Sequence, residues 1–352
     1  MLSKMKMGVV GLSGIGNGHA QAIAKSDFAE LAGVCSRREA SFEKIRSVVP
    51  DLFCTTTYEE LLRLEGLEAV VVATPDHLHV EQTLEALRSG KHVLCEKPIA
   101  YRVEDGVSMV EAARNAGKAL FVGHVCRYAG GFRLAKKMVD DGVIGELFFL
   151  ESEYAHNYDE VGAGKSWRTD PQIGREQVVS GGCHAIDILR WYGGNPTEVQ
   201  AYANRKVLSS WTTDDTTVGI YRFPNGAIGK VFVSAAVRRN YTMRTVLYGS
   251  KGTIIADNVS DGVTLYSAEL NTRFMQSGPM RHPETLGVSI PSRNSGKSLP
   301  EQLAAFHTAI VQGKEGTANG ESAVNTLATS LATVEAAKTG RAVKIDYPYP
   351  DK

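Results

Sequence analysis

This sequence lacks closely spaced cysteine pairs, an excess of charge of either sign and long apolar runs. Five cysteines occur in 352 residues, none of them in a Cys-x-x-Cys pair. Most lie inside apolar runs, where a reduced cysteine behaves as a small hydrophobic residue, which fits a reducing compartment. Lysine plus arginine and aspartate plus glutamate each number 39, so the formal net charge is zero. A nucleic-acid or anionic-membrane partner normally requires a basic excess, and neither partner is expected.

Targeting signals are also missing. The first residues, 1–7, are too short and too broken to read as a signal peptide. No apolar run approaches the roughly 20 residues that span a bilayer. The sequence therefore predicts a cytoplasmic protein with no membrane partner.

The composition is that of a globular protein, with 43% hydrophobic and 22% charged residues. At about 150 residues per domain, this length predicts roughly two domains. Residues 1–124 alternate short apolar runs with stretches of helical periodicity, the pattern of β-α-β units with a parallel sheet. The expected strands are 7–12, 31–35, 69–73, 92–95 and 120–122, and the expected helices are 18–25, 38–48, 58–64, 77–89 and 103–116.

Residues 125–352 follow a different pattern, which predicts an α+β domain for substrate binding and oligomerisation. Asn225-Gly226 lies between two strand-like runs and is a strong hairpin signal. Hairpins in series favour a large, mostly antiparallel sheet. Residues 268–298 are polar and irregular, and a surface loop is expected there. Two C-terminal helices, near 300–312 and 321–339, are expected to close this domain or to pack back on the first. The expected strands are 147–154, 199–204, 216–223, 227–235, 242–248 and 253–256, with a helix at 132–140.

The first predicted strand runs directly into Gly11-Leu12-Ser13-Gly14-Ile15-Gly16 and a helix. A G-x-G-x-x-G loop in this context binds dinucleotides through amides at the helix N-terminus. Gly11 is expected to make the tight turn and Gly16 to allow close packing of helix on strand. Ser13 replaces the middle glycine, and the neighbouring Gly14 is expected to supply the flexibility. The alternative is a merely structural turn.

The second predicted strand ends in Ser36-Arg37-Arg38, about 20 residues after the glycines. NAD enzymes usually carry Asp or Glu here for the ribose 2′-hydroxyl. Ser36 can instead donate to a 2′-phosphate, and Arg37 or Arg38 can pair with its charge. NADP is therefore the preferred cofactor and NAD the alternative, unless the arginines simply begin a solvated helix.

Two further predicted strands end in chemically capable residues. One ends in Thr74-Pro75, with His79 shortly after, and the next ends in Glu96-Lys97-Pro98. Ligands of open α/β sheets bind at the carboxyl ends of strands, so Lys97 would stand beside a nicotinamide. The alternative for Glu96 and Lys97 is a surface salt bridge.

At this point the sequence resembles the glucose–fructose oxidoreductase/inositol dehydrogenase family (Gfo/Idh/MocA). The matching features are Glu96-Lys97-Pro98, the Thr-Pro-x-x-x-His segment from Thr74 to His79, Arg127-Tyr128, the turn at 142–145, Trp167-Arg168, His184-Ala-Ile-Asp187 and Leu189-Arg190-Trp191. They cover nearly the whole chain. The resemblance implies a Rossmann domain joined to a domain with a large open antiparallel sheet.

The resemblance also implies roles for individual residues. Lys97 would orient the substrate and assist proton transfer, and His184 would be the general acid/base, without a metal. An imidazole of ordinary pKa suits both directions of transfer. Without the family, His184 reads equally well as a buried structural histidine. The residues expected to line the cofactor are Thr74, Pro75, His79, Glu96, Lys97, Trp167 and Arg168.

Residues shortly before and shortly after His184 in the sequence are also expected to contact the substrate. Asp187, one helical turn on, either orients the imidazole or begins the helix. Many sugar and inositol dehydrogenases of this family carry Asp four residues before the histidine, whereas this chain has Ser180, which puts simple inositol-type chemistry in doubt. The expected substrate-binding residues are Lys97, Arg127, Tyr154, His156, Ser180, His184 and Asp187, with Asn157 as a further candidate.

These features favour an NAD(P)-dependent oxidoreductase acting on a sugar, cyclitol or sugar derivative. Two alternatives stay open: glycoside cleavage by transient oxidation with NAD, and a non-catalytic dinucleotide-binding sensor. By resemblance, the open sheet face is expected to join a homodimer or homotetramer.

Overall fold

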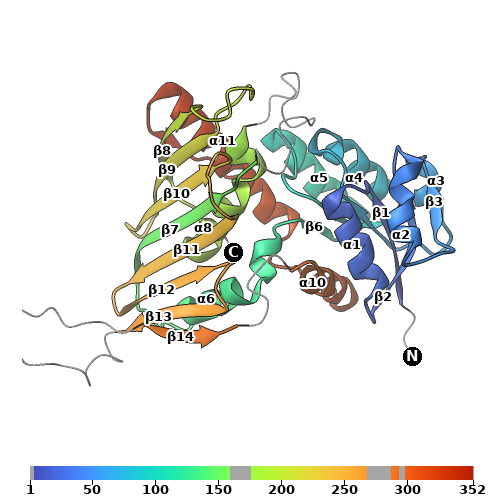
Figure 1. The fold of residues 1–352 in the computed structure, drawn as a ribbon, viewed down its shortest axis with the longest axis horizontal. Helices are drawn as coiled ribbons and strands as arrows, with labels where there is room; N and C mark the ends of the chain where they lie inside the picture. Colours follow the sequence, from blue (N-terminus) through green and yellow to red (C-terminus); the bar gives the residue numbers. More distant parts are fainter. Residues whose placement is uncertain (1–3, 159–175, 268–286, 293–297, 352) are drawn as a thin grey trace, which may run out of the picture. The chain divides into compact units, whose positions relative to one another are not determined.

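The computed structural model describes residues 4–158, 176–267, 287–292 and 298–351 (Figure 1). The chain forms two compact units. The first unit comprises residues 1–125 and 298–327, and the second comprises 126–297 and 328–352. Within the described ranges, no helix is long and apolar enough to cross a bilayer.

The first unit is built on a six-stranded parallel sheet in the order β3-β2-β1-β4-β5-β6. Of its two central strands, β4 is short, fully apolar and fully buried, as expected for a strand covered on both faces. The predicted Rossmann-type parallel sheet is confirmed. The strands are β1 Met5–Val10, β2 Ala29–Cys35, β3 Phe53–Thr55, β4 Ala69–Val72, β5 His92–Cys95 and β6 Leu120–Val122.

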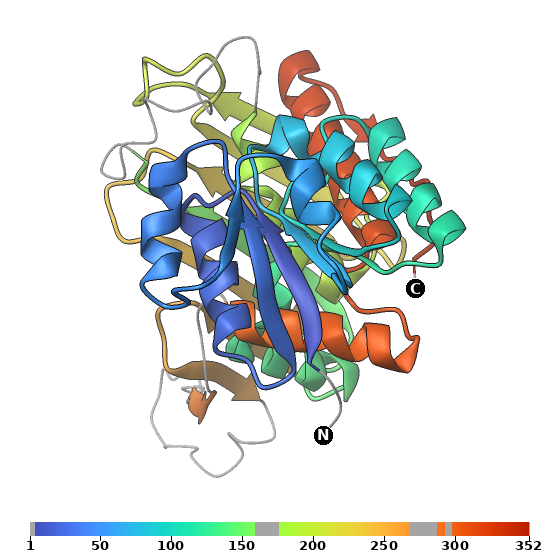
Figure 2. The same cartoon turned by 90° about the vertical axis from the view of Figure 1, so that its right-hand side faces the viewer.

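Helices cover both faces of this parallel sheet (Figure 2). One group includes α1 Gly14–Ala24 and α10 Leu299–Gln312, which pack against each other. The other includes the packed pair α4 His79–Arg88 and α5 Val103–Ala116. The shorter elements are η1 Glu39–Phe42, α2 Glu43–Arg46, α3 Tyr58–Leu62 and η2 Asp76–Leu78.

Helix α10 is part of the core of the first unit, although it comes late in the chain. Leu303 and Phe306 are fully buried in the same cluster as Met7 of β1. The Phe306 ring meets Phe121 of β6 edge to face, with centroids 5.2 Å apart. This helix therefore completes the apolar cover of the parallel sheet.

The second unit is built on a nine-stranded sheet in the order β14-β13-β12-β11-β7-β10-β9-β8-β15. All neighbours are antiparallel except β7 and β10, so the predicted large, mostly antiparallel sheet is confirmed. Helices α6 Gly130–Asp140 and α8 Cys183–Gly193 pack on it. The strands are β7 Leu147–Ala155, β8 Glu198–Asn204, β9 Thr216–Arg222, β10 Ile228–Ser234, β11 Thr242–Gly249, β12 Gly252–Asp257, β13 Gly262–Ser267, β14 Val288–Pro291 and β15 Val343–Lys344. The remaining elements are η3 Val125–Tyr128, α7 Gln177–Ser180 and α11 Gly320–Thr339, which passes from the first unit into the second.

Some sequence expectations were wrong in detail. Helix α1 begins at Gly14 rather than Gly18, because the glycine-rich loop itself enters the first turn. Within the predicted loop 268–298, residues Val288–Pro291 form β14, which pairs with β13. This strand carries only a short alternating pattern, too weak to mark it out from the polar residues around it.

Candidate active site

Because all strands of the first sheet are parallel, their carboxyl ends lie at one edge. Strand β1 lies between β2 and β4. From β1 the chain adds β2 and β3 on one side and then β4, β5 and β6 on the other, so the strand order reverses between β1 and β4. A crevice forms at such a switch point, outside the carboxyl ends of the strands. The segments that follow β1, β2, β4 and β5 all carry predicted cofactor residues.

The glycine-rich loop after β1 has no room for a side chain at two positions. Gly11 has a φ of 90°, and a Cβ there would lie 2.6 Å from the backbone carbonyl of Ala73. A Cβ on Gly16 would lie 1.8 Å from the carbonyl oxygen of Gly11. A Cβ on Gly14, in contrast, would meet nothing within 4 Å. Gly11 and Gly16 thus serve the backbone packing, while Gly14 leaves an unobstructed surface beside the loop.

The start of α1 has the form of an anion cradle. Ser13 is the N-cap residue, and its side chain does not cap the helix. The first intrahelical bond runs from the Asn17 amide to the Ser13 carbonyl at 2.9 Å. The amides of Gly14, Ile15 and Gly16 therefore have no partner within the helix. These amides and the positive end of the helix dipole fit a pyrophosphate.

The end of β2 presents two arginines and no carboxylate at 36–38. Arg37 and Arg38 are exposed, and Ser36 is half-buried. The Ser36 amide donates to the Thr55 carbonyl of β3 at 3.1 Å, which fixes the turn. In the described part of the chain, neither guanidinium makes an ion pair.

The turn after β4 is tied to the turn after β5 by His79. The ring Nδ1 lies 2.8 Å from the Pro98 carbonyl oxygen, and Nε2 lies 3.0 Å from that of Thr74. Burial lowers the pKa of His79, against the opposing effect of these carbonyls and of Asp76. The Thr74 hydroxyl donates to Gln82 Oε1 at 2.6 Å. Both ring nitrogens of His79 thus contact backbone, and its predicted cofactor contact stays a prediction.

The end of β5 places Lys97 directly after a buried carboxylate. One oxygen of Glu96 lies 2.9 Å from His19 Nε2, and the other accepts the Lys97 amide at 3.2 Å. Burial alone would raise the pKa of Glu96, but the His19 hydrogen bond and the charges of His19 and Lys97 lower it to about 2. Glu96 is therefore a buried, ionised group, and the reading of Glu96 as half of a surface salt bridge was wrong. Lys97 itself is half-buried, and its bond to Pro98 is cis.

In the second unit, His184 lies in the first turn of α8 and is fully buried. Two glycines bring this turn onto the sheet. A Cβ on Gly181 would lie 2.7 Å from the Tyr154 ring of β7, and one on Gly182 would lie 2.6 Å from Val233 of β10. The buried Ser180 hydroxyl, at the end of α7, donates to Gln177 Oε1 at 3.2 Å.

Arg127 and Asp187, both predicted to bind substrate, form a buried ion pair with each other. Arg127 Nε donates to Asp187 Oδ2 at 2.8 Å, and Nη2 donates to Oδ1 at 2.6 Å. The guanidinium also lies over the Trp191 ring, 5.9 Å from its centroid. Because a buried pair of this kind is costly to break, it anchors η3 on α8. Both Asp187 oxygens are engaged by Arg127, and substrate contacts for these two residues stay predictions.

Tyr154 and His156 belong to an aromatic cluster beside His184. The Tyr154 ring lies 6.2 Å from that of His184, with 27° between the planes. Its hydroxyl hydrogen-bonds to that of Tyr158 at 2.7 Å. His156 stacks on Tyr158 at 4.4 Å, and Tyr241 meets Tyr154 edge to face at 5.5 Å. Burial, with the neighbouring Tyr158, raises the pKa of Tyr154 well above its ordinary value, so this phenol is neutral. Asn157 is buried and pairs with Ala236 in an isolated antiparallel bridge.

Sequence reasoning missed several partners of the predicted residues. His19 holds Glu96, Gln177 holds Ser180, and Tyr158 and Tyr241 pack with Tyr154 and His156. One signal was available, because His19 lies on the buried stripe of α1 with Ala20 and Ile23. Trp167 and Arg168 lie outside the described residues. Among the residues that are described, no group of three or more His, Cys, Asp or Glu could hold a metal ion.

The topology and the glycine-rich loop define the first unit as a dinucleotide-binding Rossmann fold. A family model described as "Oxidoreductase family, NAD-binding Rossmann fold" matches residues 5–124. A second, the GFO/IDH/MocA C-terminal domain, matches residues 132–255. The chain belongs to the Gfo/Idh/MocA family of oxidoreductases, which confirms the resemblance seen in the sequence.

Individual relatives agree with this family. The chain is similar to a 1,5-anhydro-D-fructose reductase of Ensifer adhaerens, with 33% identity over 83% of this chain and 84% of the relative. It is also similar to a myo-inositol 2-dehydrogenase of Thermotoga maritima, with 26% identity over 97% and 99%. Among solved structures, a levoglucosan dehydrogenase in complex with NADH shares the fold, with a TM-score of 0.87 and 20% identity over 98% of this chain and 100% of that one.

Proposed function

We propose that this oxidoreductase transfers hydride between NADP or NAD and a carbon of a sugar, cyclitol or sugar derivative, interconverting a hydroxyl and a carbonyl. The observation that carries the proposal is the position of Lys97. It follows the carboxyl end of β5, and its amide donates to the buried carboxylate of Glu96. Relatives named as reductases and dehydrogenases of anhydro-sugars and inositol support the substrate class.

Two side chains carry the proton chemistry in this proposal. Lys97 donates a hydrogen bond to the substrate oxygen and orients it. His184 takes the hydroxyl proton during oxidation and returns it during reduction. The bound nicotinamide supplies the hydride chemistry. Tyr154, His156 and Ser180 are placed around the substrate, and Arg127 with Asp187 holds η3 against α8.

A substrate panel tests this function. The purified protein is mixed with NADP or NAD and a set of sugars, cyclitols, sugar acids and anhydro-sugars, and reduced nicotinamide is followed at its near-ultraviolet absorption. The reverse reaction is run with the keto sugars. Turnover on one polyol class is the expected result. Tight cofactor binding without turnover on any member would instead favour a sensor.

A second candidate keeps the same residues but gives no net redox change. One relative, of Escherichia coli, is named a 2,7-anhydro-N-acetylneuraminate hydratase, with 25% identity over 96% of each chain. Transient oxidation followed by elimination would explain such a reaction. Glycosides and anhydro-sugars in the panel, followed by product analysis under catalytic NAD, separate it from net oxidation.

NADP is the proposed preference, because Arg37 and Arg38 are exposed at the end of β2 and no carboxylate lies at 36–38. Arg37→Ala with Arg38→Ala is expected to weaken NADP binding roughly tenfold to a hundredfold, the worth of one or two charge-assisted hydrogen bonds, and to leave NAD binding nearly unchanged. Fluorescence titration of both reduced cofactors measures the ratio. Arg63→Ala with Arg88→Ala, also exposed arginines of this unit, controls for net charge. Equal losses of affinity for both cofactors would contradict the proposal that these two arginines bind the 2′-phosphate of NADP.

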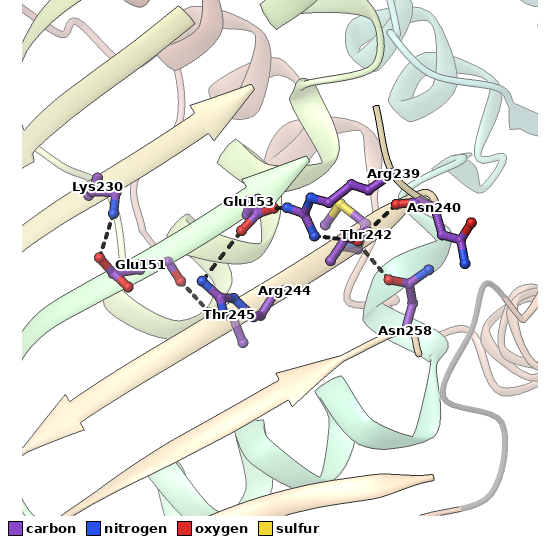
Figure 3. Close-up of polar contacts among 10 residues, drawn as sticks. Glu151, Glu153, Lys230, Arg239, Asn240, Thr242, Arg244, Thr245 and Asn258 are labelled. Atoms are coloured by element: carbon purple, nitrogen blue, oxygen red, sulfur yellow. Dashed lines mark hydrogen bonds and ion pairs between the residues drawn. The ribbon is translucent and has the colours of Figure 1, made fainter. Parts of the chain in front are cut away.

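The sheet of the second unit has a face that turns away from its helices, here called the open face. Residues on the helix side, such as Val233, meet the α7–α8 turn. On the open face, Lys230 lies opposite Glu151 and their charges meet at 2.6 Å. Glu153 lies between Arg239 and Arg244 (Figure 3). On the Lys230 side of these pairs, strands β8 to β10 carry exposed apolar side chains, namely Tyr202 (71% exposed), Ile220 (46%) and Ile228 (47%).

We infer that the open face joins two copies of this chain in a homodimer or homotetramer. Exposed apolar side chains gathered on one face are typical of protein–protein interfaces. Lys230→Glu would gather three carboxylates at its centre, and like charges at an interface cost several kcal/mol. We expect this variant to dissociate in light scattering, and Glu151→Lys added to it to restore the assembly. Lys206→Glu, in an exposed loop, is the control. A monomeric parent protein would overturn the inference.

A further inference from the structure

A buried hydrogen bond between His19 and Glu96 joins helix α1 to the end of strand β5, and the proposed chemistry gives this bond no role. His19 belongs to α1 and Glu96 follows β5, 77 residues later. Their side chains are 0% and 8% exposed, and Nε2 lies 2.9 Å from Oε1. Such a contact inside the first unit fixes both side chains in one arrangement.

The carboxylate of Glu96 is bound on two sides and closely packed on a third. His19 binds Oε1, and the Lys97 amide donates to Oε2. On a third side lies Gly123, where a Cβ would lie 2.6 Å from Oε2. Any side chain at 123 would push the carboxylate away. The chain thus keeps space for this carboxylate and binds it directly to the backbone of Lys97.

The protonation of the pair follows from its contacts. Glu96 is ionised, because its pKa is lowered to about 2 despite its burial, which alone would raise it. His19 must then donate through Nε2. Its Nδ1 has no hydrogen-bond partner among the described residues. Without His19, a buried carboxylate would keep only the Lys97 amide, and it would be expected to move toward water or toward the Lys97 ammonium.

We propose that His19 is a positioning residue for Lys97. Its Nε2–H donates to Glu96 Oε1, and Glu96 Oε2 accepts the Lys97 amide. These two hydrogen bonds fix the position of the Lys97 backbone, and with it the origin of the Lys97 side chain. The inference rests on the proposed role of Lys97 in turnover. His19 has no contact with substrate or cofactor in this proposal, so altering it is expected to leave the amides of the glycine-rich loop in place.

Matched variants at position 19 test the proposal. Glutamine places an amide nitrogen near the position of imidazole Nε2, whereas asparagine places it near Nδ1 and too far from Glu96. We expect His19→Asn to lower kcat about 10- to 100-fold, the cost of a misplaced catalytic group. Cofactor Kd from fluorescence titration is expected to stay close to the parent value, and His19→Gln to recover most of kcat. Equal kcat for the Asn and Gln variants would overturn the proposal.

A double variant separates positioning from stability. His19→Leu leaves the Glu96 charge buried with one partner, so both Tm and kcat should fall. Adding Glu96→Gln removes that charge, and Tm should largely return while kcat stays low. Recovery of kcat together with Tm would show that the pair serves stability alone and would overturn the inference.

The Lys97→Met variant keeps the two proposals distinct. If it retains turnover, the proposed role of Lys97 fails; if it loses turnover while His19→Asn does not, only this inference fails.

Discussion

Lys97→Met is expected to lower turnover about 10²- to 10⁴-fold, the usual contribution of a positioned proton-transfer group. Methionine approximates the four-atom apolar stem of lysine and lacks the ammonium. Because the Lys97 amide still donates to Glu96, the turn after β5 should keep its shape. Cofactor affinity and Tm should therefore change little. Stopped-flow kinetics with the best substrate of the panel, together with cofactor titration, measure the separation.

Lys118→Met is the matched control. Lys118 precedes β6 and so lies at the opposite edge of the same parallel sheet, away from the strand ends that carry the site. It should leave kcat near that of the parent. Unchanged turnover in Lys97→Met would remove Lys97 from the mechanism. Equal losses in both variants would point to a general effect of lost positive charge.

The parallel sheet was readable from the sequence because its strands are buried on both faces. Val70, Val71 and Val72 have no exposed surface, so β4 is a continuous apolar run with turn residues after it. Strand β3 was not readable in the same way. It has three residues, of which Phe53 is exposed, and it exists because it pairs with β2 at the sheet edge. A short edge strand depends on its neighbour rather than on its own pattern.

Within the site, the sequence indicated which residue types would gather but not which would bind one another. The strand-end rule placed Lys97 and the glycine-rich loop at one edge, because topology alone decides this. It did not reveal that Glu96 turns inward to His19, or that Arg127 and Asp187 bind each other. Those pairings join positions 77 and 60 residues apart. They depend on the packing of α1 and α8, which a local pattern does not contain.

The same distinction applies to the loop glycines, where the structure separates two roles that the sequence motif treats together. Gly16→Ala would place a Cβ 1.8 Å from the Gly11 carbonyl oxygen, a backbone atom that cannot move cheaply. We expect α1 to shift away from β1, with a stability loss of about 1–3 kcal/mol, as is usual for overpacking. The anion cradle would be displaced with it, so cofactor binding should fall below detection in titration. Thermal unfolding measures the stability part.

Gly14→Ala is the control that isolates the loop surface from the fold. A Cβ at this position meets no protein atom within 4 Å, and alanine favours helix over glycine by up to about 1 kcal/mol. Tm should therefore hold or rise slightly. If a pyrophosphate lies against this surface, the added methyl group will weaken cofactor binding without any loss of stability. Cofactor affinity equal to that of the parent would place the pyrophosphate away from Gly14. A fall in Tm as large as that of Gly16→Ala would contradict the packing difference between these two glycines.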